Sequence, residues 1–333
     1  MLVSGSLAYF YGCFTKTKMN NIKTKLAAIF KAARPIHWVK NLSLFAAIIF
    51  TGQLFVEFQF LRVFFAFIAF NFATSATYVF NDILDVKNDR MHPTKRFRPI
   101  ASGKLPISLA WLEVVFLSSF ALALALALSE VFFLLVGGYL LLQAAYSLYL
   151  KHLPVVDILI IASGFIVRIY AGAFVIDAHL SVWFLLCVIS VALFLASGKR
   201  RAELSVVDKP GETRKSLMKY PKELLNSYVT MFGNAAWMSW ALFSFFESPK
   251  ASLPLWLVLA EFSRATTVNK LLMVTIPITI FGIMRYESLI FEGKSEAPEK
   301  LLLTDLPLVA SVVLWVMVVV WIFYSGVTVA PLS

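Results

Sequence analysis

The sequence predicts an all-α polytopic membrane protein, a single bundle of nine transmembrane helices. Two observations carry this prediction. The chain of 333 residues is 60% hydrophobic and only 15% charged, whereas roughly a quarter of the residues in a soluble globular domain are charged. The apolar residues, among them 31 phenylalanines, are gathered in runs long enough to cross a bilayer, and short charged loops separate these runs.

A bilayer core of about 30 Å requires roughly 20 apolar residues of helix. A shorter run at 253–262 is expected to lie in the membrane interface. Because no Pro/Ser-rich linker separates a second domain, we expect one transmembrane domain over residues 42–330, preceded by an extension and an amphipathic lead-in over residues 1–41. The nine predicted spans lie near residues 42–57, 62–80, 107–128, 131–149, 155–176, 180–197, 226–246, 271–290 and 307–329.

Lysine and arginine set the direction of these spans, because cytoplasmic loops retain them. With the N-terminus inside, nearly all of the 30 basic residues lie on the cytoplasmic side, and only Arg62, Lys250, Arg264 and Lys270 lie on the other. Topology therefore explains the net charge of +11, and this charge gives no reason to expect binding to nucleic acid. We expect a multi-pass protein of the plasma (inner) membrane with a cytoplasmic N-terminus and the anionic leaflet of the lipid bilayer as a partner.

The N-terminal segment is interpreted in two parts. Residues 1–18 lack the basic start and the cleavage site of a secretory signal, and we expect an upstream extension, with translation beginning at Met1 or at Met19. Residues 22–33 are amphipathic and are expected to lie in the interface near Trp38. The two cysteines are far apart and the four histidines are scattered, which argues against a disulfide framework and a zinc site.

A cluster of carboxylates follows the second predicted span. Asn81, Asp82, Asp85 and Asp89 form the pattern Asn-Asp-x-x-Asp-x-x-x-Asp, and on a continued helix the three aspartates share one face. Carboxylates this close repel one another unless a cation lies among them, and oxygen ligands favour Mg²⁺ or Mn²⁺ bound together with substrate phosphates. The alternative is a solvated helix end with pairs to neighbouring basic residues. The metal–diphosphate interpretation is favoured, with Asp82, Asp85 and Asp89 as catalytic metal ligands.

Several motifs resemble one known family. The stretch reads "NDILDVKNDR", which is similar to the first aspartate-rich motif of the UbiA superfamily of intramembrane prenyltransferases. This resemblance implies a nine-helix bundle with an active site at its cytoplasmic mouth, where Mg²⁺ and a diphosphate bind. The segments that narrow the resemblance to its decaprenyl-phosphate phosphoribosyltransferase branch read "RPIHWVKN" (34–41), "YSLYLKHLPVVDILIIASGFIVRIYAG" (146–172) and "GKRRAEL" (198–204).

The sequence departs from aromatic prenyltransferases after the sixth span. Those enzymes carry a second aspartate-rich motif there, whereas this chain has Lys199, Arg200 and Arg201, followed by Glu203. The resemblance implies phosphoribosyl diphosphate and a polyprenyl phosphate as substrates, and their additional phosphates require additional cations. Lys199, Arg200 and, further on, Arg214 are therefore candidate phosphate ligands. The alternative is that these cations only keep the loop in the cytoplasm.

Three candidates lie between the fourth and fifth spans. Tyr146 and Lys151 are candidate substrate contacts, although Lys151 could equally be a topological anchor. Asp157 lies one turn into a span, where an ionised carboxylate needs a partner: Lys151, a loop arginine or the metal. Arg168 lies about three turns further on and is expected to face the bundle interior, where it either binds substrate or braces helices.

The remaining candidate phosphate ligands are Asn81, Lys40, Lys95 and Arg98, although a snorkelling anchor would explain Lys40 equally well. As the resemblance implies it, the reaction transfers 5-phosphoribose to the polyprenyl phosphate with release of diphosphate, supplying lipid-linked pentofuranose for cell-envelope polysaccharides. The prediction allows an oligomer as well as a monomer.

Two rival functions make different predictions about the sequence. An aromatic or lipid prenyltransferase predicts the missing second aspartate motif. A transporter predicts inverted repeats and broken helices near the bilayer midplane, and the sequence shows no convincing inverted repeat.

Overall fold

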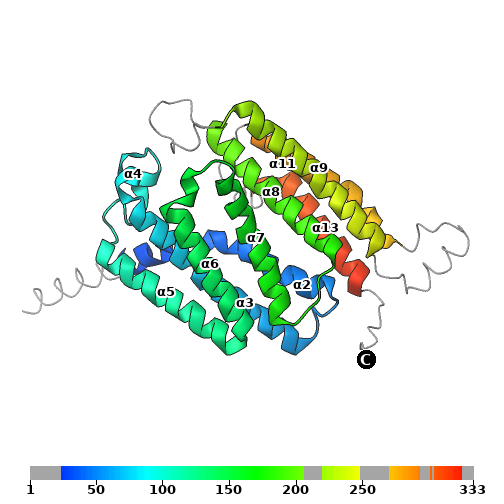
Figure 1. Cartoon of the computed structure of the whole chain (residues 1–333), viewed down its shortest axis with the longest axis horizontal. Coiled ribbons are helices and arrows are strands. Elements are labelled where there is room, and N and C mark those ends of the chain that lie inside the picture. The colour runs from blue at the N-terminus through cyan, green and yellow to red at the C-terminus, as the bar shows by residue number, and fades with distance from the viewer. Residues whose placement is uncertain (1–23, 206–219, 248–269, 293–300, 302–303, 325–333) are drawn as a thin grey trace, which may run out of the picture.

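The computed structural model describes residues 24–205, 220–247, 270–292, 301 and 304–324, and this part of the chain forms helices and loops without a β-strand (Figure 1). Seven of its helices are long and apolar enough to cross a membrane, as the composition predicts. They are α3 (Glu57–Leu84), α5 (Ile107–Leu128), α6 (Glu130–Leu148), α7 (Val156–Val175), α8 (Val182–Ser205), η6 continued by α11 (Leu271–Thr275 and Ile276–Phe291) and α13 (Leu306–Tyr324).

An eighth helix accounts for the span predicted at 226–246. Helix α9 (Lys222–Phe246) has 25 residues and is therefore about 38 Å long, enough to cross. It is less apolar than the other seven because it carries polar residues such as Asn226, Thr230 and Asn234.

The first predicted span, 42–57, is wrong as a continuous helix. The chain forms a 3₁₀-helix, η1 (Pro35–Leu44), followed by the six-residue α2 (Phe45–Phe50). Pro35 fixes the backbone at the start of η1, and Gly52, at φ 75°, turns the chain after α2. At about 2.0 and 1.5 Å per residue, the two pieces together reach roughly 29 Å, so the composite is still long enough to cross.

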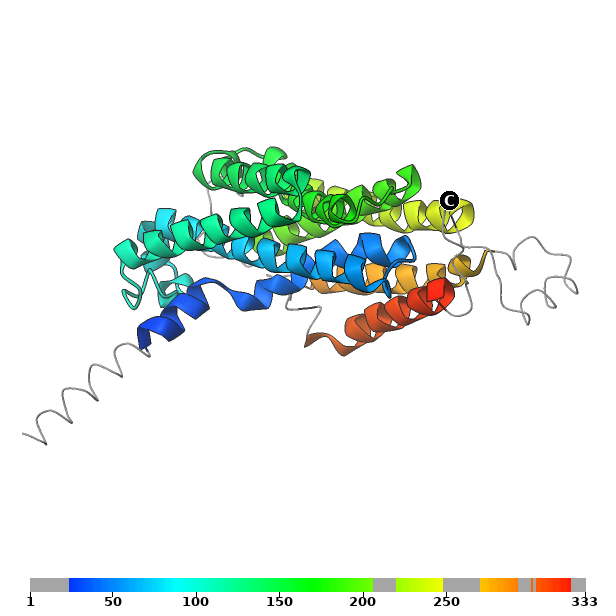
Figure 2. The same ribbon diagram turned by 90° about the horizontal axis from the view of Figure 1, so that it is seen from below.

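Helix α7 lies at the centre of the bundle and packs against η1, α2, α3, α6 and α8 (Figure 1). Its contact with η1 is close: a Cβ atom on Gly172 would lie 2.1 Å from the carbonyl oxygen of Leu44. The helices run side by side along the length of the molecule (Figure 2). At one end α3, α6 and α8 end while α5, α7 and α9 begin. This end, called the aspartate end below, also contains Asp82.

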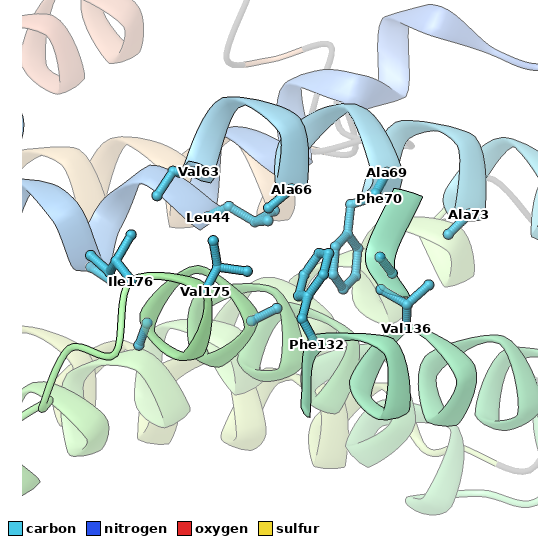
Figure 3. Close-up of a cluster of buried hydrophobic side chains, with 14 of the residues drawn as sticks. Leu44, Val63, Ala66, Ala69, Phe70, Ala73, Phe132, Val136, Val175 and Ile176 are labelled. Atoms are coloured by element: carbon cyan, nitrogen blue, oxygen red, sulfur yellow. The ribbon is translucent and has the colours of Figure 1, made fainter. Parts of the chain in front are cut away.

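The opposite part of the bundle is filled by apolar side chains. Phe70 of α3 and Phe132 of α6 are fully buried, with ring centroids 5.9 Å apart, and face each other in Figure 3. The small residues Ala66, Ala69 and Ala73 let α3 approach its neighbours closely. Within a membrane, close van der Waals packing of such side chains stabilises the arrangement. The polar candidates consequently gather elsewhere, toward the aspartate end.

Candidate active site

The aspartate motif lies on two helical pieces. Helix α3 ends at Leu84, Asp85 leaves helical geometry with ψ near 4°, and α4 (Val86–Met91) carries Asp89. The expectation of one continuous helix is therefore corrected, although Asp82 and Asp89 still lie close enough to share one nitrogen of Arg98. The break is confined to Asp85, because the backbone N–H of Asp85 still donates to Asn81 and that of Asp89 to Asp85.

Asp82 is buried and has two arginine partners. One Nη atom of Arg34 lies 2.5 Å from its Oδ1, and Nη1 of Arg98 lies 3.0 Å from the same oxygen. The same Nη1 lies 2.6 Å from Oδ2 of Asp89. Arg98 therefore joins the carboxylates of α3 and α4, and Arg34 ties the N-terminal segment to them.

Packing of the flanking segments explains how these arginines reach the site. The Ser75 hydroxyl donates to the carbonyl of Ala33 and accepts from the indole of Trp38, which holds the start of η1 against α3. The loop that carries Arg98 is folded back by the buried side chains of Ile100 and Leu105.

Asp85 is held from a different direction. Its Oδ1 lies 2.7 Å from Nζ of Lys151, and its Oδ2 accepts a hydrogen bond of 3.0 Å from the Asn81 amide. Lys151 belongs to the short 3₁₀ turn η3 (Leu150–His152) between α6 and α7. The sequence left Lys151 as a substrate contact or a topological anchor, and the structure places it against the aspartate motif.

Electrostatically, three carboxylates face three cations, Arg34, Arg98 and Lys151. Burial raises the pKa of Asp89 above its ordinary value, although Arg98 opposes the shift. Within the described residues, no three acidic, cysteine or histidine side chains converge on one point as a metal cluster. The donors nevertheless fit a hard divalent ion, because they are oxygens that already attract positive charge.

A second polar cluster surrounds Asp157. Asp157 has its Oδ2 2.6 Å from Nε of Arg200, and its Oδ1 accepts a hydrogen bond of 2.6 Å from the Tyr220 hydroxyl. Arg200 also donates to the Tyr146 hydroxyl at 2.7 Å and pairs with Glu203. Burial and the bond to Asp157 raise the pKa of Tyr220, which keeps its hydroxyl protonated. The partner expected for Asp157 is thus Arg200.

Arg168 forms a third cluster and acts as a brace between helices. Its Nε donates to the Asn41 amide oxygen at 2.6 Å, its Nη1 to the Gly164 carbonyl at 2.5 Å and its Nη2 to the Tyr139 hydroxyl at 2.9 Å. Asn41 in turn donates to Asn71. The network joins η1, α3, α6 and α7 within the bundle.

The other candidates are dispersed. Lys40 lies on η1, and Lys95 on η2 (Lys95–Phe97) lies close enough to lower the pKa of Asp89. Lys199 is partly buried near the end of α8. Arg214 lies outside the described residues, as do the interfacial segment 253–262 and the extension 1–18.

Sequence reasoning did not assign Arg34, Glu203 or Tyr220 to any cluster. Arg34 stands directly before Pro35 in a segment that carried the resemblance, and this position was the available signal. Tyr220 offered no signal, because the long connection between α8 and α9 hides its proximity to Asp157.

A bundle of membrane-crossing helices with carboxylates and cations gathered at one end defines an integral-membrane enzyme for phosphorylated substrates. The profile of the UbiA prenyltransferase family matches residues 41–260, and the chain belongs to this family. The protein is accordingly a multi-pass membrane protein.

Two relatives and one solved structure extend this assignment. The decaprenyl-phosphate phosphoribosyltransferase of Corynebacterium glutamicum is 36% identical over 88% of this chain and 86% of its own length. The enzyme of the same name from Mycobacterium tuberculosis H37Rv is 34% identical over 92% of this chain and 95% of its own. A UbiA homologue from Archaeoglobus fulgidus, solved with DMAPP and Mg²⁺, superimposes with a TM-score of 0.64 over 91% of this chain and 99% of its own, at 17% identity, which shows a shared fold.

Proposed function

We propose that this chain transfers 5-phosphoribose from phosphoribosyl diphosphate to a polyprenyl phosphate of the decaprenyl type, releasing diphosphate. The product would supply lipid-linked pentofuranose for cell-envelope polysaccharides. The observation that carries the proposal is the aspartate motif with its three paired cations, Arg34, Arg98 and Lys151. Similarity to decaprenyl-phosphate phosphoribosyltransferases over most of the chain supports it.

Asp82 and Asp85, helped by Asp89 and Asn81, would hold a divalent cation, Mg²⁺ or Mn²⁺. When bound, the ion supplies positive charge to the diphosphate of the donor. Oxygen-only donors suit such an ion, which commonly binds through few carboxylates together with substrate phosphates.

The side chains of this site act by positioning and by electrostatics. The bond between ribose C1 and the diphosphate oxygen breaks, and the electron pair leaves with the diphosphate. An oxygen of the acceptor phosphate forms the new bond to C1. A phosphate monoester is already anionic near neutral pH, so the reaction needs no strong general base. Arg98 and Lys151 would stabilise the departing charge, which is the larger share of catalysis in such sites.

The remaining cations are assigned by position. Lys40, Lys95, Lys199 and Arg214 would bind the 5-phosphate of the donor or the acceptor phosphate. Arg200 contacts Asp157, Glu203 and Tyr146, and its side chain is 1% exposed. It would act through Tyr146 and Asp157 as a positioning residue.

We further propose that the aspartate end faces the cytoplasm, with the N-terminus on the same side, because soluble phosphoribosyl diphosphate must reach it. The lysine and arginine distribution supports this orientation.

The test uses purified protein in detergent with polyprenyl phosphate, Mg²⁺ and radiolabelled phosphoribosyl diphosphate. Label is followed into the butanol-extractable lipid. Asp85→Asn should reduce transfer by at least about 10²-fold, and EDTA should abolish it. The matched control is Asp177→Asn, an exposed aspartate beyond the far end of α7, which should transfer normally. Turnover of a prenyl diphosphate onto an aromatic acid, without any labelled lipid, would contradict the proposal.

A further inference from the structure

The carboxylates proposed to hold the metal are each bound by a cation of the protein. Asp82 has Arg34 and Arg98, Asp89 shares Arg98, and Asp85 has Lys151. Each of the three carboxylates is therefore already paired with a cation of the protein, and Lys95 adds further positive charge near Asp89. The cations that a phosphorylated donor needs are thus the same groups that neutralise the carboxylates that a metal needs.

Exposure differs between the two halves of the arginine pairs, whereas in the third pair Lys151 is 6% exposed and Asp85 17%. The side chains of Asp82 and Asp89 are 2% and 6% exposed, whereas those of Arg34 and Arg98 are 20% and 25% exposed. A buried carboxylate is costly without a positive partner. A guanidinium that reaches solvent, in contrast, can turn toward another oxygen anion at small cost. The arginines are therefore the movable halves of the pairs.

Arg34 is placed so that it can change partners. Arg34 directly precedes η1 and has a backbone φ of 52°. Its guanidinium carbon lies 5.0 Å from the ring centroid of Tyr78, which gives it a second, neutral contact. Cation–π contact stabilises a guanidinium that has left a carboxylate.

We propose, on the basis of the function proposed above, that metal and donor bind by exchange of partners. Arg34 and Arg98 occupy the carboxylates of Asp82 and Asp89 until the donor arrives. They then move to its phosphate oxygens, whose geometry suits the guanidinium fork, while the divalent ion takes the carboxylates. Arg34 becomes a ligand of the donor.

The charges make this exchange cooperative. A divalent ion that binds alone displaces the cations and leaves them without a counter-ion. A donor that binds without metal draws the cations away from buried carboxylates. Only when both bind does every charge keep a partner, so each ligand tightens the other by the same factor. The consequence is weak binding of either ligand alone and tight binding of the two together.

The decisive measurement is the affinity for Mn²⁺ without donor, followed by electron paramagnetic resonance on the purified protein in detergent. Arg34→Gln frees Asp82 from one competitor and should tighten Mn²⁺ binding roughly tenfold, within the usual range of coupling factors. The same variant should weaken phosphoribosyl diphosphate binding by a similar factor. A residue that merely supports the metal site would weaken Mn²⁺ binding, and this result, or an unchanged Mn²⁺ affinity, would overturn the proposal.

Two variants keep the test decisive. Arg98→Gln should shift both affinities in the same directions, and it replaces Arg34→Gln if that variant does not fold. Arg62→Gln removes the same charge near the other end of α3, where Arg62 donates to the Leu128 carbonyl, and it should leave Mn²⁺ affinity unchanged. If Arg62→Gln also bound Mn²⁺ more tightly, the change in affinity would follow from net charge alone, and the exchange would be overturned.

A parallel titration with geranyl diphosphate separates this inference from the proposed function. Mn²⁺ and geranyl diphosphate could strengthen each other's binding while Mn²⁺ and phosphoribosyl diphosphate do not. This result would overturn the proposed donor and retain the exchange at the carboxylates. Labelled lipid product without mutual tightening of Mn²⁺ and phosphoribosyl diphosphate retains the function and overturns the exchange.

Discussion

The aspartate motif and the cluster around Asp157 are both built from aspartate–arginine pairs, yet they differ in burial. Both side chains of the Arg200–Asp157 pair are 1% exposed, whereas Arg34 and Arg98 in the aspartate motif reach solvent. A fully buried pair costs several kcal/mol to separate, whereas a partly exposed guanidinium can leave at small cost when another cation takes its carboxylate. The difference in exposure suits the aspartate motif for exchanging partners with a substrate, and it suits the cluster around Asp157 for holding the helices in place.

The buried cluster also explains the position of Lys151. Tyr146 lies before the turn that carries Lys151 and Asp157 lies after it, and both contact Arg200. The Tyr220 hydroxyl additionally accepts the backbone N–H of Val155, and it donates to Asp157. The turn is thereby held on both sides, and Lys151 is directed toward Asp85.

The largest effect is expected when the buried pair is broken. Arg200→Met leaves Asp157 charged and buried, which should destabilise the protein by about 3–5 kcal/mol. Thermal unfolding in detergent measures the loss as a lower Tm. The double variant Arg200→Met with Asp157→Leu removes both charges and should recover most of it.

Arg201→Met is the matched control for that change. The neighbouring arginine donates to the Asn226 amide, and its replacement leaves the Arg200–Asp157 pair intact, so a smaller loss in Tm is expected. An equal loss in the two variants would remove the distinction between the clusters.

An intermediate effect is expected in the cluster of Arg168, whose partners are neutral. Asn41→Leu removes the acceptor for Nε of Arg168, and a buried donor left unsatisfied costs about 1–3 kcal/mol. The measurement is again Tm in detergent. Asn234→Leu, on an exposed part of α9, should change stability by less than about 0.5 kcal/mol. A larger loss in Asn234→Leu than in Asn41→Leu would contradict the role of the network.

The smallest effect sharpens the comparison. Tyr220→Phe removes the hydrogen bond to Asp157 and the one accepted from the Val155 N–H. It leaves the ion pair between Asp157 and Arg200, so a loss of about 1–2 kcal/mol is expected. Transfer activity should be retained, since the hydroxyl touches no proposed substrate group. Tyr149→Phe, at an exposed tyrosine, should leave Tm unchanged. A collapse of activity in Tyr220→Phe at unchanged Tm would move Tyr220 into the catalytic machinery.

Much of the fold could be predicted because hydrophobic length is a local property. Eight of the nine predicted spans correspond to helices in the described chain. The first span failed as a continuous helix, since its break at Pro35–Leu44 is stabilised by the contacts of Asn41 with α3 and α7. Such contacts leave no periodic pattern in the sequence.

The sequence by itself determined the class of protein, the positions of eight spans and the acidic motif, because composition, run length and short spacing are written along the chain. Only the tertiary structure decided the partners: Arg34 for Asp82, Lys151 for Asp85, and Arg200 for Asp157. These pairs join residues 43 to 66 positions apart, and helix packing, which depends on side-chain shape throughout the bundle, brings them together. The physical reason is that a buried charge accepts whichever opposite charge the packing places beside it.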